Sequence, residues 1–130
     1  MYSSDIGRLV LRLCLGGLML FHGVHKVLHP GSLDFIGSRL NTFSLPPELA
    51  YGVYLGEVLA PLMIIFGFGT RLGGLMIVIN MVFAILLVHS HELTMLTSHG
   101  GWQLELQAFY LFGGLAVALL GSGRIALSRD

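Results

Sequence analysis

The stretch "LMLFHGVHKVLHPG", residues 18–31, combines the two features that decide the fold. A run of leucine, methionine and phenylalanine leads directly into three histidines and a lysine. Pro30 and Gly31 end the segment, because proline cannot continue a helix and glycine permits a turn. His22 and Lys26 lie four residues apart and therefore share one face of a helix. The stretch predicts an apolar helix that carries ionisable groups on one face just before it ends.

The composition around this stretch is that of a membrane protein. The chain has 130 residues, of which 55% are hydrophobic and 11% are charged, and its mean hydropathy is +0.82. A soluble domain averages about 25% charged residues, so we expect one integral membrane domain. Seven basic and seven acidic side chains give zero net charge, and no basic excess points to a nucleic-acid partner. The single cysteine, Cys14, excludes an internal disulfide and a CxxC motif.

Four segments are apolar enough to cross a bilayer, which requires about 20 mostly apolar residues. They cover approximately residues 6–28, 49–68, 72–88 and 104–120. We therefore predict an all-α fold, a four-helix transmembrane bundle formed by a single domain over residues 1–130. The sequence "SLDFIGSRL", residues 32–40, is expected to lie along the membrane interface between the first two spans.

The distribution of lysine and arginine predicts the orientation. With four spans, both termini and the turn between spans two and three lie on one side. That side holds five arginines, which are Arg8, Arg12, Arg71, Arg124 and Arg129, whereas the other side holds Lys26 and Arg39. Because positive residues favour the cytoplasmic side, we expect both termini in the cytoplasm and all six histidines on the outer side.

Ionisable groups inside the predicted spans suggest a polar pocket in the outer half of the bundle. At a helical rise of 1.5 Å per residue, Glu57 lies roughly 12 Å deep and His22 about 9 Å deep. Each such group costs about 2.5–3.5 kcal/mol on insertion scales, so Glu57 is expected to pair with His22 or Lys26. These three are the candidate catalytic residues. Pro61 has no N–H for the Glu57 carbonyl, so we also expect a bend there.

Three further residues are candidates for binding a substrate at this level. Trp102 and Glu105 lie near the outer end of span four, and Asn80 is an amide in the middle of span three that must find a partner. Two simpler interpretations stay open. The ionisable groups can form an interhelical contact that only fixes packing, and Trp102 can be an interfacial anchor.

The outer histidines offer a weaker alternative, a copper or zinc site. His89, His91 and His99 lie in or beside the third loop, and imidazole is a common metal ligand. Their spacing is not that of a standard site, so we assign no metal ligands in the main prediction.

The sequence also resembles the DoxX family of small membrane proteins. The resemblance rests on "LRLCLGGLMLFHGVHKV" (11–27), on "YLGEVLAPLMIIFGFGTRLGGL" (54–75) and on the end "GSGRIALSRD" (121–130). It implies a four-helix, multi-pass bundle in a bacterial cytoplasmic membrane and marks Lys26, Glu57 and Arg71 as positions of the family pattern. Some relatives are subunits of thiosulfate:quinone oxidoreductases, and others are linked to thiol stress or to aromatic compounds.

These observations lead to three functional hypotheses. The first is a membrane subunit of a redox or quinone-linked system, with a quinone as candidate cofactor and catalysis shared with a partner. The second is a membrane protein that handles copper or zinc. The third is a non-catalytic scaffold or assembly subunit. Besides the lipid bilayer, a soluble or membrane-bound redox protein and a second copy of this chain are the candidate partners.

Overall fold

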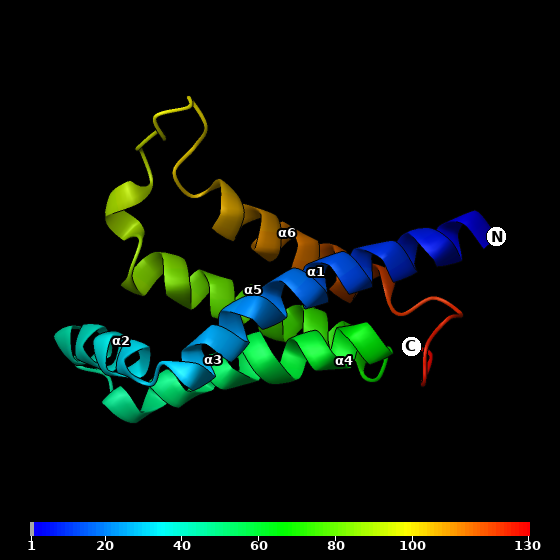
Figure 1. Cartoon of the computed structure of the whole chain (residues 1–130), viewed down its shortest axis with the longest axis horizontal. Helices are drawn as coiled ribbons and strands as arrows, with labels where there is room; N and C mark the ends of the chain where they lie inside the picture. Colours follow the sequence, from blue (N-terminus) through cyan, green and yellow to red (C-terminus); the bar gives the residue numbers. More distant parts are fainter. Residues whose placement is uncertain (1) are drawn as a thin grey trace.

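Four long helical stretches lie against one another in the computed structural model, which describes residues 2–130 (Figure 1). The first is α1, Tyr2–Leu28, which is followed by the shorter α2, Gly31–Thr42. The second stretch, Pro47–Phe66, is continuous and comprises η1 (Pro47–Tyr51), α3 (Gly52–Tyr54), η2 (Leu55–Leu59) and α4 (Ala60–Phe66). The others are α5, Thr70–Leu87, and α6, Glu105–Leu120, with the short η3, Ser90–Glu92, between them.

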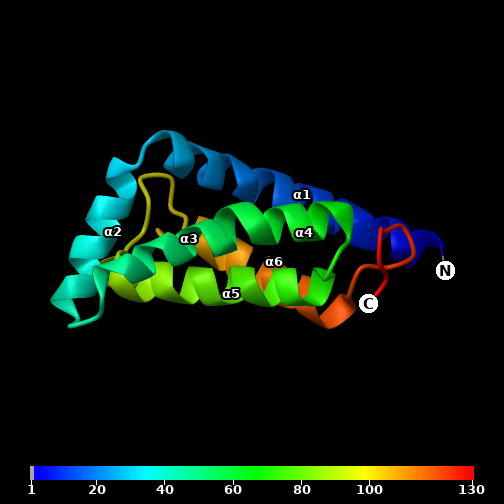
Figure 2. The same ribbon diagram turned by 90° about the horizontal axis from the view of Figure 1, so that it is seen from below.

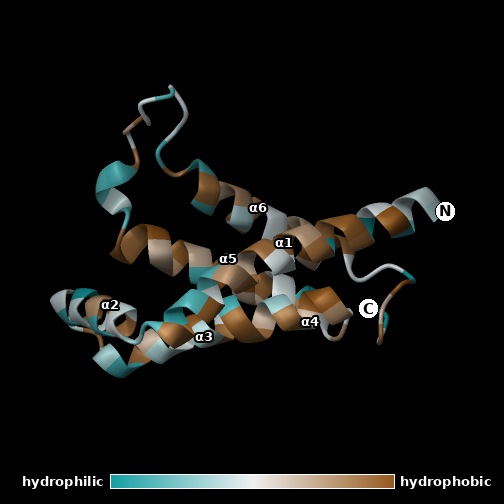
Figure 3. Cartoon of the chain, viewed as in Figure 1, coloured by the Kyte–Doolittle hydropathy of each residue, from teal (hydrophilic) through white to brown (hydrophobic). Residues whose placement is uncertain are grey.

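The predicted all-α helical bundle is confirmed. Within residues 2–130 there is no β-strand, only an isolated bridge between Leu96 and Trp102. Three of the stretches, α1, the 47–66 helix and α5, are long and apolar enough to cross a membrane by length and composition. The fourth, α6, is apolar but has only 16 residues. Figure 3 shows that hydrophobic residues dominate these helices and that hydrophilic residues gather on α2 and the loop before α6.

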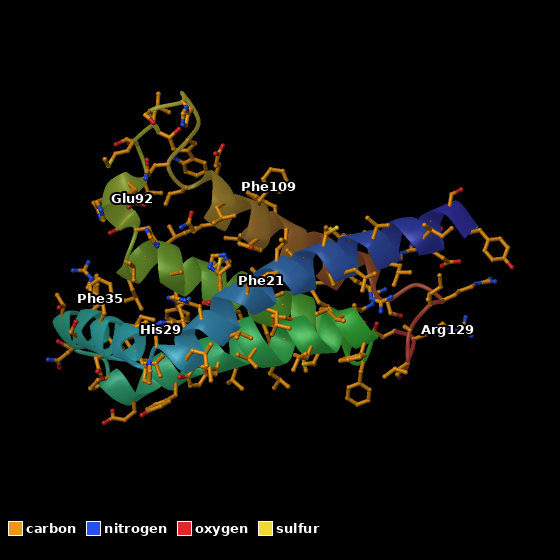
Figure 4. All side chains as sticks on the ribbon, in the orientation of Figure 1. Phe21, His29, Phe35, Glu92, Phe109 and Arg129 are labelled. Carbon is orange, nitrogen blue, oxygen red and sulfur yellow. The ribbon has the colours of Figure 1, made fainter. Side chains whose placement is uncertain are left out.

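Small residues let the helices approach closely. A Cβ on Gly74 of α5 would lie 2.6 Å from the carbonyl oxygen of Gly114 on α6, which is too close for any side chain. The core between the helices contains buried Met19, Ile64 and Ile77. Other large apolar side chains, Phe21 and Phe109 among them, are exposed, and Figure 4 shows Phe109 directed away from the bundle. Such outward faces fit a lipid environment.

Both termini lie at the same end of the bundle (Figures 1 and 2), as expected for an even number of spans. Gly121 and Gly123 have φ of 77° and 74°, and these left-handed conformations turn the chain back after α6. The segment 121–130 then runs beside the end of the 47–66 helix. There the Leu127 N–H donates to the Phe66 carbonyl at 3.1 Å. The assignment of this end to the cytoplasm stays a prediction.

Arg12 joins this segment to the rest of the bundle. Its side chain is 1% exposed. It donates to four backbone carbonyls, those of Ile64, Ile65, Ser122 and Ile125, at distances of 2.6–3.2 Å. Arg71 makes a second group of hydrogen bonds of this kind. Its guanidinium donates to the carbonyls of Ala118 and Leu119 at the end of α6. The buried Arg12 side chain thus joins α1, the 47–66 helix and the C-terminal segment.

The opposite end of the bundle is crossed by α2, the piece expected at the membrane interface (Figure 2). Leu33 and Leu40 of α2 are buried against Ala50 and Leu87, in a small cluster of their own. The Arg39 side chain donates to the Leu87 carbonyl at 2.8 Å and so binds α2 to the end of α5.

Candidate intramembrane site

Glu57 lies where the second span departs from a regular helix. Leu55–Leu59 forms a π-turn, in which the Ala60 N–H donates to the carbonyl of Leu55, five residues earlier. Pro61 follows immediately and offers no N–H to the Glu57 carbonyl. The sequence predicted a bend from Pro61, and the structure shows the irregularity as this wide turn just before the proline. Turns of this kind often occur at functional sites.

The Glu57 carboxylate is shared by side chains from two other helices. It is 3% exposed. One oxygen forms an ion pair with the Lys26 ammonium of α1, and the other accepts a hydrogen bond from the Asn80 amide of α5 at 2.9 Å. A buried carboxylate requires both a counter-charge and hydrogen bonds, and this arrangement supplies both. We call these three residues the carboxylate cluster.

Two glycines make the carboxylate cluster sterically possible. A Cβ on Gly23 of α1 would lie 2.0 Å from the Glu57 carbonyl oxygen, so α1 touches the backbone of the second span at that point. A Cβ on Gly56 would lie 2.4 Å from the Asn80 Cβ. Because both neighbours of the second span approach so closely, the Lys26 and Asn80 side chains reach the same carboxylate.

A cavity of about 540 Å³ lies beside the carboxylate cluster, between the second span and α5 and beneath α2. Its polar lining comes from Lys26, Ser32, Glu57, Asn80 and His89. The remaining walls are mostly aliphatic and aromatic side chains, such as those of Phe35, Leu55 and Phe83. Ligand sites in proteins have volumes of about 300–1,000 Å³, apolar walls and a few convergent polar groups. The cavity has these properties.

His22 lies apart from the carboxylate cluster. Its side chain is exposed on α1 and packs edge-on against the Tyr110 ring of α6, with the ring centroids 5.6 Å apart. Of the two partners expected for Glu57, the structure pairs it with Lys26.

Of the three predicted substrate-binding residues, only Asn80 belongs to the carboxylate cluster. Asn80 lines the cavity and bonds Glu57, whereas neither Trp102 nor Glu105 is among the lining residues. The Trp102 indole donates to the Leu93 carbonyl at 2.8 Å, within the loop before α6. Glu105 is exposed at the first turn of α6. The structure thus brings Lys26, Glu57 and Asn80 together and leaves the other two at the loop.

Two of the three loop histidines, His89 and His91, lie beside one carboxylate, that of Glu92. His89 Nδ1 lies 2.9 Å from Glu92 Oε2, and His91 Nε2 lies 3.6 Å from Glu92 Oε1. His99 is exposed in the following loop. Among residues 2–130, no three histidine, cysteine, aspartate or glutamate side chains gather in an arrangement that could hold a metal ion.

The sequence reasoning did not anticipate Gly23 and Tyr110 as neighbours of this region. Gly23 precedes Lys26 by three residues, and a glycine one turn from a lysine inside an apolar span is a usable indication of close helix contact. Nothing local distinguishes Tyr110 from an ordinary aromatic residue in an apolar span.

The fold and the carboxylate cluster define a small helical membrane protein in which a buried glutamate pairs with a partly buried lysine beside an apolar cavity. The model of the DoxX family matches residues 7–90, which is more than half of the chain, and the chain belongs to this family. The relatives include a protein of Bacillus subtilis (strain 168) with the description "Putative oxidoreductase CatD". It is 29% identical over 126 residues, which cover 96% of this chain and 87% of the relative. No solved structure matches the chain.

Proposed function

We propose that this protein is a membrane subunit of a redox system and that it binds the head group of a quinone in the cavity beside Glu57. The observation that carries the proposal is the position of the carboxylate cluster, a hydrogen-bonded Lys26, Glu57 and Asn80, at the edge of an apolar cavity of about 540 Å³. The description of the Bacillus subtilis relative as an oxidoreductase supports the redox part of the proposal.

The residues of the cavity suit such a head group. A bound quinone would accept two electrons and two protons. Its ring requires apolar walls and a hydrogen-bond donor near a carbonyl oxygen. The Lys26 ammonium has three donors, and its side chain is 22% exposed, so the Glu57 contact does not enclose it. Lys26 would donate a hydrogen bond or a proton to the ligand carbonyl, and Glu57 would relay a proton to or from Lys26. Asn80 fixes the carboxylate in position.

The membrane and its sidedness are part of the proposal. The excess of arginine at the end with the termini supports a cytoplasmic position for that end in a bacterial cell. The cavity would then lie in the outer half of the inner membrane. The sequence has one cysteine and no haem-attachment motif, so a partner protein would deliver or remove the electrons.

The first experiment is native mass spectrometry of the protein purified gently from its own membrane. We expect an isoprenoid quinone adduct in the wild type and in Glu48→Gln, a control carboxylate that does not line the cavity. In Glu57→Gln the adduct should be lost or reduced at least tenfold. Retention of the adduct by Glu57→Gln at the wild-type level would disprove the assigned role.

A second variant avoids any change to the ion pair. Gly52 lines the cavity and is helical, and a Cβ there meets nothing within 4 Å, so Gly52→Leu should narrow the cavity without strain. Gly17→Leu is the matched control, because Gly17 has the same free space but lies outside the cavity lining. Loss of the quinone in Gly52→Leu alone is expected. A wild-type chain that retains no ligand would instead favour the scaffold hypothesis.

A further inference from the structure

Several wall residues of the cavity are also surface residues. Leu55 of the second span and Ile79 and Phe83 of α5 line the cavity, and they are 54%, 49% and 50% exposed. They are apolar, and they belong to helices long and apolar enough to cross a membrane. At this side of the molecule, between the second span and α5, the wall of the cavity is therefore also the face that meets lipid.

The end of the cavity nearest the loops is covered by α2. Phe35, Ile36 and Leu40 of α2 contribute to the lining. The helix is held there by the Arg39 bond to the Leu87 carbonyl and by close contact with the second span. A Cβ on Gly37 would lie only 3.3 Å from the Pro47 side chain. This cover separates the carboxylate cluster from the solution beyond the outer end of the bundle.

We infer that the cavity opens sideways into the bilayer, past Leu55, Ile79 and Phe83, and that its ligand is an amphiphile with a long apolar tail. This inference rests on the proposed function and specifies the ligand class and the route. Leu55 lies two residues before Glu57, and Ile79 lies next to Asn80, so the opening is at the depth of the carboxylate cluster. A head group that bonds Lys26 leaves its tail in this opening.

The route determines which ligands reach the site. A small hydrophilic ion would have to cross the hydrocarbon region to reach Lys26, and the burial of polar groups in hydrocarbon is strongly unfavourable. A tailed ligand is already dissolved in the membrane and reaches the opening by lateral diffusion. The tail also gains contact with the apolar walls, so affinity should increase with tail length.

The test compares two quinones that share one ring, a tail-less benzoquinone and the same ring with an isoprenoid tail of ten units. Binding is measured with isotope-labelled quinones in lipid nanodiscs, with concentrations expressed per lipid and protein-free discs subtracted. Leu55→Trp and Ile79→Trp add bulk at the opening. Leu59→Trp and Leu75→Trp are matched controls, about equally exposed one helical turn away and outside the cavity lining.

We expect the tailed quinone to bind Leu55→Trp and Ile79→Trp at least tenfold more weakly than the wild type, while the tail-less quinone changes less than twofold. The controls should match the wild type for both ligands. If both opening variants bind the tailed quinone normally while Glu57→Gln does not, the lateral opening is wrong and the head-group site stands. If neither quinone binds the wild type, the proposed function fails and this inference fails with it.

Discussion

Gly23→Ala tests the contact on which the carboxylate cluster depends. The new methyl group would lie 2.0 Å from the Glu57 carbonyl oxygen, about 1.4 Å inside the 3.4 Å at which ordinary van der Waals contact begins. The opposing atoms belong to the backbone and cannot rotate away. The two helices must therefore separate, and the separation also lengthens the Lys26–Glu57 contact, because Lys26 lies one turn from Gly23.

The expected cost can be estimated from related substitutions. Overpacking of a core costs typically about 1–3 kcal/mol, and a clash with backbone belongs at the upper end of that range. We therefore expect a loss of about 3 kcal/mol in the free energy of unfolding, a factor of about 100 in the folding equilibrium. For a chain of this size the midpoint of thermal unfolding should fall by roughly 10 °C.

The assay is thermal unfolding in a fixed detergent, followed by the fluorescence of Trp102. Gly17→Ala is the matched control, since Gly17 lies on the same helix and a Cβ there meets nothing within 4 Å. It should leave stability unchanged or raise it by about 0.5–1 kcal/mol, because alanine favours the helix over glycine. A Gly23→Ala protein as stable as Gly17→Ala would refute the close approach of α1 to Glu57.

Three further predictions concern polar side chains that join different helices or segments. Arg12→Met leaves four carbonyls without their donor and should lower the free energy of unfolding by at least about 3 kcal/mol. Arg124→Met, where the arginine side chain is exposed and lies 3.9 Å from Asp5, should lower it by less than about 1 kcal/mol in the same denaturation assay. Glu57→Gln alone should lower the free energy of unfolding by about 3 kcal/mol, and adding Lys26→Met should restore at least about 1 kcal/mol of it. Strict additivity of the two effects in this double-mutant cycle would contradict a direct ion pair. Asp130→Asn removes a charge beside the first turn of α5 and should cost about 0.3–1 kcal/mol, with a difference that shrinks in high salt; a salt-independent loss would exclude the electrostatic explanation.

The helical architecture was predictable because it depends on long-range properties of the chain. Apolar runs, prolines and glycines located the helices within a few residues, and residues 32–40, predicted to lie along the membrane interface, form the helix α2, Gly31–Thr42. The first helix begins at Tyr2 rather than near residue 6, since hydropathy reports lipid contact and not where helical hydrogen bonds start. The fold-back of residues 121–130 was not foreseen, because it depends on two glycines in left-handed conformations and on single hydrogen bonds that leave no periodic pattern.

The site was predictable only where the free-energy cost of burying a charge requires an oppositely charged partner. Glu57 had to be neutralised inside an apolar span, and Lys26 was one of two cations at a suitable depth. The helical wheel placed His22 on nearly the same face, but α1 contacts both the second span and α6, and His22 lies on the side of Tyr110. Depth and face can be read from one helix, whereas the choice of neighbour depends on how the helices cross.

Arg12 has a consequence for the order in which the bundle is completed during synthesis. It lies 110 residues before Ser122, one of the residues whose carbonyl it binds. A ribosome that adds about 5–20 residues per second needs roughly 5–20 s to cover that distance. During this time Ile64 and Ile65 can accept hydrogen bonds from the guanidinium, but its other donors must bind water. The end of the bundle that carries the termini is therefore the last part to close, and until it does Arg12 lacks the two acceptors that Ser122 and Ile125 supply.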